Sequence, residues 1–219
     1  MVDRTCRRAG VMRQRLSPID PDIVTKVSAA LRDRQSQRLC DVLEQVEPNA
    51  GTWCEGWTAH DVAVHVWILK RDPLGWPGVV VPRLGRRRAA RIRGRWPYGE
   101  LVARLRRQSG AIAAMPLDRW EDHRHALGEY WMHTQDVARP QGVIQPEVDD
   151  ELAEALWLRV QPAAAALHRR TRGLTLIHAD GRRVTVTRGT PTLRVLGTPA
   201  ELMCWAYGRP AEVSIEQLA

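Results

Sequence analysis

The chain has 219 residues, of which 44% are hydrophobic, so it can form one or two modest domains around a real core. Its longest apolar stretch, residues 62–69, is too short to cross a membrane, and the basic N-terminus has no apolar run that could serve as a signal peptide. The formal net charge of +8 is concentrated in two places: residues 1–15 carry net +4 and residues 83–107 net +9, which leaves −5 on the rest. We therefore expect a cytoplasmic protein with a mildly acidic body.

Residues 1–21 are basic and lack a sustained apolar period. Pro18 and Pro21 would also interrupt a helix in this segment. We expect the segment to be a disordered extension that lies outside the folded part of the chain.

Two helices are predicted in the first half of the chain. Apolar residues recur near a 3.6-residue period from Asp22 to Val46. A second helix is predicted from Ala59 to Arg71, because Thr58 can cap its N-terminus and Asp61 follows three residues later as the acidic partner. Residues 72–96 contain three prolines and four glycines, and are therefore predicted to form a long connection that carries the arginine cluster.

In the second half of the chain, the apolar pattern changes from a helical period to strand-like alternation after Gly173. Before it, three further helices are predicted, at 98–114, 125–138 and 147–170. After it, apolar residues alternate in three short strands, with a hairpin turn at Asp180 and Gly181, and a closing helix follows at 199–207. The fold class is therefore mainly α: an antiparallel four-helix bundle over residues 22–170 and a small α+β unit over residues 171–219.

The helix predicted at 125–138 carries a candidate pair of metal ligands. Glu129 and His133 stand at i and i+4, which places their side chains about 6 Å apart on one helical face. His65 shares the apolar side of its helix with Val66 and is therefore expected to point into the bundle. From spacing alone, an exposed Glu–His pair is the usual interpretation of Glu129 and His133, and a buried histidine such as His65 is more often a hydrogen-bonded core residue than a ligand.

The four cysteines, Cys6, Cys40, Cys54 and Cys204, are widely spaced and include no CxxC pair. Neither a disulfide framework nor a cysteine zinc site is indicated. We expect them to be buried or incidental thiols.

Three motifs together resemble a known family. The first is W-T-x-x-D-V-x-x-H-V at 57–66, the second E-Y-x-x-H-x-x-D-V at 129–137, and the third ELMCWAYGR at 201–209. Their order and spacing resemble the DinB-like metal-binding bundles, and more closely the actinobacterial group related to mycothiol-dependent maleylpyruvate isomerase. The resemblance extends over about residues 30–215.

This resemblance implies a divalent metal, Zn²⁺ by preference, held by His65, Glu129 and His133. Three protein ligands leave one coordination position open, as in catalytic rather than structural zinc sites. In the related enzymes the incoming group is mycothiol, whose thiolate attacks an electrophilic small-molecule substrate. The resemblance also suggests Asp136 as an acceptor that orients a ligand imidazole, and Arg209 as a clamp for a substrate carboxylate, although a solvated helix charge and a surface arginine are the plain alternatives.

Two other functions stay open from the sequence. The protein could bind a metal without catalysing a reaction, or it could bind a polyanion through the region from Arg83 to Arg107. The second is weakened because no helix-turn-helix, zinc-finger or RNA-binding motif is recognised, and because the arginine bias is typical of a high-G+C genome. The sequence does not indicate the substrate or the oligomeric state.

Overall fold

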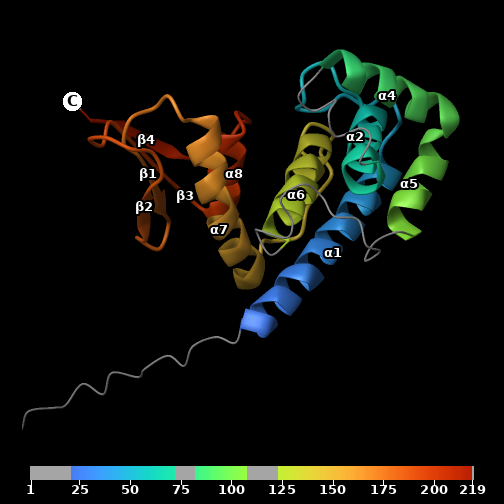
Figure 1. Ribbon diagram of the computed structural model, residues 1–219. Coiled ribbons are helices and arrows are strands. Elements are labelled where there is room, and N and C mark those ends of the chain that lie inside the picture. Colours follow the sequence, from blue (N-terminus) through green and yellow to red (C-terminus); the bar gives the residue numbers. More distant parts are fainter. Residues whose placement is uncertain (1–20, 73–81, 108–122, 219) are drawn as a thin grey trace, which may run out of the picture.

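The computed structural model describes residues 21–72, 82–107 and 123–218, and side chains from residue 29 onward. The described part is mainly helical with one small sheet (Figure 1). Its elements are α1 (Pro21–Gln45), α2 (Ala59–Arg71), α4 (Pro82–Arg95), α5 (Tyr98–Arg107), α6 (Arg124–Ala138), α7 (Asp150–Leu167), β1 (Leu174–His178), β2 (Arg183–Thr185), β3 (Leu193–Gly197), α8 (Pro199–Ala206) and β4 (Ser214–Gln217). The extension expected at residues 1–21 lies outside the described residues, except for Pro21 at the start of α1.

Four of the helices pack side by side. α1 contacts α6 most extensively and also contacts α5, while α2 lies against α5 and α6 and is covered on its outer side by α4 (Figure 1). The core between them is apolar and includes Leu39, Leu43, Val62, Val66, Leu101 and Leu105. This packing places one face of α2 against one face of α6, the two helices that carry the predicted metal ligands.

The start of α2 is fixed by a local hydrogen-bond motif. The Thr58 backbone N–H donates to Asp61 Oδ2 at 2.9 Å, and the Asp61 backbone N–H donates to Thr58 Oγ1 at 3.3 Å. This is the capping box that the sequence predicted, and the predicted helix boundaries, Ala59 and Arg71, are confirmed. Because the first turn is fixed, the direction in which His65 leaves the helix is fixed as well.

The prediction of a long connection at 72–96 is wrong for most of the arginine-rich part of this segment, since residues 82–95 form helix α4. Arginine is a good helix former, and Pro82 stands at the first position of the helix, where its missing N–H costs nothing. Ile92 is 4% exposed and faces the core, so α4 also has an apolar anchor. Pro73 and Pro77, which suggested a loop, lie outside the described residues.

The C-terminal part is a four-stranded sheet in the order β2-β1-β3-β4, packed against α8 and α7. β1 and β2 form the predicted antiparallel hairpin, β1 pairs with β3 in parallel, and β3 pairs with β4 in antiparallel fashion. The sequence analysis missed β4, because its four residues are all exposed and show no apolar alternation. No described helix is long and apolar enough to span a membrane.

The start of α7 differs from the prediction for a local reason. α7 begins at Asp150 rather than at Glu147, because the Asp149 side chain accepts from the Leu152 N–H and caps the helix there. α5 is described as far as Arg107, so its predicted continuation to residue 114 lies outside the described residues.

Candidate metal centre

Helices α2 and α6 bring together three side chains that can ligate a metal. His65 comes from α2, and Glu129 and His133 come from α6; one ligand atom of each lies within 4.8 Å of the others. The centroids of the two imidazole rings are 4.9 Å apart, and His133 Nε2 is 3.8 Å from Glu129 Oε2. The structure therefore brings the three predicted residues together at one point.

The chemistry and spacing of this donor set fit a zinc-type cation. Two imidazoles and one carboxylate form a known set of catalytic zinc ligands. Donors about 2.1 Å from a shared tetrahedral ion lie about 3.4 Å from one another, so the separations found here need only a small contraction. Glu129 and His65 are half-buried and His133 is buried, which leaves the centre partly screened from water.

The two histidines have opposite electrostatic environments. Burial, and secondly the charge of His133, lower the pKa of His65 to about 3, so that this imidazole is neutral and can donate a lone pair. Burial also acts to lower the pKa of His133, but hydrogen bonds with Asp136 and Cys54 and the charge of Glu129 outweigh it and raise the pKa to about 10. A proton on His133 thus balances the nearby carboxylates when no cation is bound.

Asp136 is the buried acceptor behind His133. It is 1% exposed, and its Oδ2 lies 3.1 Å from His133 Nδ1, one turn along α6. Burial raises its pKa, but hydrogen bonds from His133 and Arg209 outweigh burial and bring the pKa to about 2. Asp136 is therefore ionised and holds Nδ1 of His133, which leaves Nε2 for the side where Glu129 and His65 lie.

Arg209, in the segment after α8, reaches the same carboxylate. Its Nε donates to Asp136 Oδ1 at 2.6 Å, and one terminal nitrogen is 3.2 Å from Cys54 Sγ. Arg209, predicted to bind a substrate carboxylate, thus binds the carboxylate of Asp136 and connects the C-terminal unit to α6. Its side chain is 23% exposed, so only an outer edge remains available to another group.

Cys54 also lies at this site, which its place in the sequence does not indicate. Its thiol lies 3.0 Å from Asp136 Oδ2, and Cys54, His133 and Asp136 form a second group of possible metal ligands within 4.8 Å. This second group is the poorer cation site, because the guanidinium of Arg209 already contacts both Asp136 and Cys54. Nothing in the sequence distinguishes Cys54 from the other cysteines, since its partners are 82 and 155 residues away.

Trp57, directly before the capping box, covers the donor set from the outside. Its ring centroid lies 5.1 Å from that of His65 and 6.5 Å from that of His133. The side chain is 37% exposed, so it separates the two imidazoles from solvent on one side only.

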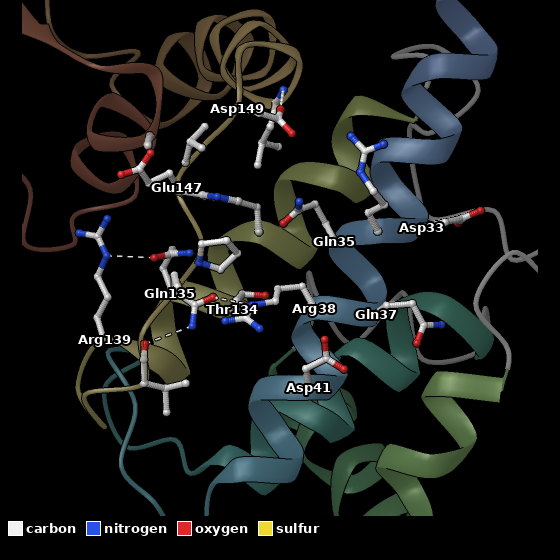
Figure 2. A pocket seen from close by; sticks show the side chains of 18 of the residues that line it. Asp33, Gln35, Gln37, Arg38, Asp41, Thr134, Gln135, Arg139, Glu147 and Asp149 are labelled. Atoms are coloured by element: carbon white, nitrogen blue, oxygen red, sulfur yellow. Dashed lines mark hydrogen bonds between the residues drawn. The ribbon is translucent and has the colours of Figure 1, made fainter.

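A cavity of about 1010 Å³ lies on the other side of α6 (Figure 2). Its lining includes residues of α1, the segment before α7, and Thr134 and Gln135 of α6, but none of the three predicted metal ligands. Its arginines are engaged with neighbours: Arg38 with Gln145 and the Ile144 carbonyl, and Arg139 with Gln135 and Glu201. The cavity is therefore not the mouth of the metal centre.

The other histidines lie away from the three ligands. His60 is buried against the Tyr98 ring, as expected for a side chain that faces elsewhere. His123 and His125 are half-buried, and arginines of α1 and α7 donate to their Nδ1 atoms at 2.8 and 2.9 Å.

Comparison with known proteins relates the fold of the chain to that of an isomerase. No family model matches the sequence, and no curated protein matches it either. The crystal structure of the mycothiol-dependent maleylpyruvate isomerase superposes with a TM-score of 0.62 at 15% identity, over 87% of this chain and 92% of that one. The chain shares the fold of this isomerase. A histidine-to-alanine mutant of the same isomerase superposes equally well, with a TM-score of 0.61 at 17% identity and the same coverage.

Proposed function

We propose that the protein is a divalent-metal enzyme of the thiol-dependent isomerase or transferase type, with Zn²⁺ held by His65, Glu129 and His133. The observation that carries the proposal is the convergence of these three donors from α2 and α6 in a chain that shares the fold of the isomerase. Mycothiol is the proposed thiol, and an electrophilic small molecule is the proposed substrate.

The metal, when bound, would lower the pKa of a thiol or a water in its open position and so supply a nucleophile at neutral pH. The chain's own residues hold and shield this position. Asp136 orients the imidazole of His133 through Nδ1, and Arg209 holds Asp136 ionised and in place. Trp57 limits the access of water on one side of the two imidazoles.

Arg209 keeps a second role within this proposal. Its Nε is committed to Asp136, but the exposed outer edge of its guanidinium can still meet a carboxylate of the substrate. Such a contact would place the substrate on the side of α6 where the metal ligands lie.

We also propose a division of the chain into a helical unit and a small α+β unit, with α7 of the first unit contributing to the apolar core of the second. α1, α2, α5 and α6 would form a DinB-like four-helix bundle within residues 22–170, and residues 171–219 the small α+β unit. The mutual packing of these four helices supports the bundle. A cytoplasmic location agrees with the proposed use of a small-molecule thiol.

The test begins with the metal content of the purified protein. We expect about one zinc per chain in the wild type, and loss of the metal in His65→Ala and in His133→Ala, while His178→Ala, which replaces a histidine in β1, keeps it. Normal metal content in both ligand variants would reject the site.

The thiol is tested on cobalt-substituted protein. Titration with mycothiol and with a simple thiol should change the visible spectrum if sulfur enters the open position. A spectrum that no thiol changes would leave a metal site that acts on water or only binds its ligand. Turnover of maleylpyruvate and related electrophiles then separates an enzyme from a metal-binding protein without catalysis.

A further inference from the structure

Helix α4 presents a row of arginines that the proposed reaction does not use. Seven of its fourteen residues are arginine, and it contains no acidic residue. The seven arginines differ in what they contact.

Two arginines of α4 form ion pairs that hold the helix against α2. Arg88 donates to Asp72, with one of its terminal nitrogens 2.8 Å from Oδ1, and Arg93 forms an ion pair with Asp61. Asp72 and Asp61 lie at opposite ends of α2, so the two ion pairs hold the C-terminal half of α4 against α2. Ile92 is buried on the same side of the helix.

Four other arginines of the helix, Arg83, Arg86, Arg87 and Arg91, form what we call the α4 arginine face. Their spacing of i, i+3, i+4 and i+8 places them on one side of the helix, and all four are exposed. None of them has a carboxylate within 4.0 Å in the part of the chain that the structure describes. These four charges account for much of the net positive charge of residues 83–107.

We propose that the α4 arginine face binds the phosphate backbone of a nucleic acid. Guanidinium groups bind phosphate oxygens in pairs, and four of them held on a rigid helix repel one another unless a polyanion lies across them. From Arg83 to Arg91 the helix rises about 12 Å, close to the width of the DNA major groove, so one chain can meet several phosphates.

A membrane surface is a poorer partner for the same face. A helix that lies on a bilayer inserts an apolar face between the lipids, whereas the apolar Ile92 of α4 is already buried in the protein. Leu84 is the remaining large apolar side chain of the helix that is exposed. The face therefore offers charge without the apolar area that membrane binding requires.

The position of α4 separates this surface from α6, which carries two of the three proposed ligands. α4 packs on α2 on the side away from the sheet, and makes no extensive contact with α6, α7 or α8 within the described residues (Figure 1). A nucleic acid can lie on α4 while the side of α6 near the C-terminal unit stays open. The proposal holds whether or not the protein is an enzyme.

The test compares two full-length variants that lose the same charge. The first replaces Arg83, Arg86, Arg87 and Arg91 by Gln. The control replaces four exposed arginines of the C-terminal part by Gln, namely Arg169, Arg170, Arg172 and Arg188. Binding to a fluorescein-labelled 20-base-pair DNA, a 20-base-pair RNA and a 20-nucleotide single strand is followed by anisotropy at several salt concentrations, with phosphatidylglycerol vesicles as a parallel probe.

We expect the wild type and the control to bind at least one nucleic acid, and the α4 variant to bind it at least about tenfold more weakly at 0.15 M salt. The slope of log affinity against log salt should fall by about 3 to 4, which is about 0.9 for each phosphate that the variant no longer neutralises. Equal losses in both variants, or no nucleic-acid binding by the wild type, would overturn the proposal. Binding to vesicles without binding to any nucleic acid would assign the face to a membrane instead. Unchanged circular dichroism and metal content establish that the variants are folded.

Discussion

Arg209 Nε lies 2.6 Å from Asp136 Oδ1, and this bond joins the segment after α8 to the helix that carries two of the three proposed metal ligands. Asp136 in turn holds His133 Nδ1. The C-terminal unit therefore contacts the proposed metal centre through two successive side chains. Any change in how this unit packs on α6 would reach His133 through Asp136.

Replacement of Arg209 by Gln should lower zinc affinity about 10- to 100-fold, the usual effect of losing a group that supports a metal ligand. The carboxylate of Asp136 would remain buried without its cationic partner, and we expect a loss of about 3 kcal/mol in the free energy of unfolding. Zinc affinity is measured by competition with a chromogenic chelator, and stability by urea unfolding.

Two further variants separate a specific effect from a general loss of charge. Arg209→Lys keeps a cation near Asp136 and should recover part of the affinity. Arg139→Gln removes an arginine that pairs with Glu201 at 2.8 Å and should leave zinc affinity unchanged. If both variants behave like Arg209→Gln, the bond to Asp136 has no special role.

Replacement of Cys54 by Ala should leave one zinc bound per chain. Cys54 belongs to the second group of possible ligands, but Arg209 contacts its sulfur and the same carboxylate, so a cation there would meet a positive charge. Metal analysis of Cys54→Ala beside His65→Ala decides between the two groups. Loss of zinc from Cys54→Ala with retention in His65→Ala would move the metal to the Cys54 side of His133.

The sequence predicts those parts of the centre that depend on nearby residues. The capping box of Thr58 and Asp61 is a three-residue pattern, and the i, i+4 spacing of Glu129 and His133 is fixed by helical geometry. His65 could be placed because the apolar period of α2 shows which side is buried. Each of these inferences needs only one helix.

The parts that the sequence did not predict depend on contacts between distant segments. Residues 72–96 have the composition of a loop, but α4 is held by ion pairs of Arg88 and Arg93 with residues 16 and 32 positions away. The contact between Arg209 and Cys54 spans 155 positions. Residue types alone do not show which of many arginines will meet which carboxylate or thiol.

Lys70 should make stability depend on alkaline pH. It is 6% exposed, its Nζ has Ser36 Oγ at 3.3 Å, and burial lowers its pKa from 10.5 to about 8. Because the unfolded chain binds this proton more tightly, the penalty is present in full below pH 8, and stability rises as pH increases from about 8 to 10.5. The shift corresponds to about 3 kcal/mol.

Lys70→Met should therefore be more stable than the wild type at pH 7, by up to about 3 kcal/mol, and should lose most of the rise between pH 8 and 10.5. Urea unfolding at half-unit steps of pH measures both effects. Ser36→Ala serves as a control, because it removes the hydrogen bond and keeps the buried amine. If Lys70→Met keeps the wild-type rise in stability between pH 8 and 10.5, a titratable group other than Lys70 causes that rise.

Gly128 should resist replacement by alanine, although alanine favours a helix by about 1 kcal/mol. A Cβ at this position would lie 2.9 Å from Arg159 Cγ and 3.0 Å from its Nε. Arg159 is 6% exposed and donates to His125 Nδ1 and to the Tyr207 hydroxyl, so it cannot move outward without giving up these contacts. We expect Gly128→Ala to lower the free energy of unfolding by about 1 to 3 kcal/mol.

At Gly99, in the first turn of α5, a Cβ would have nothing within 4 Å, so Gly99→Ala should be neutral or slightly stabilising. Equal stability changes in the two variants, measured by urea unfolding, would show that Arg159 yields and that the close approach of α7 to α6 does not require glycine.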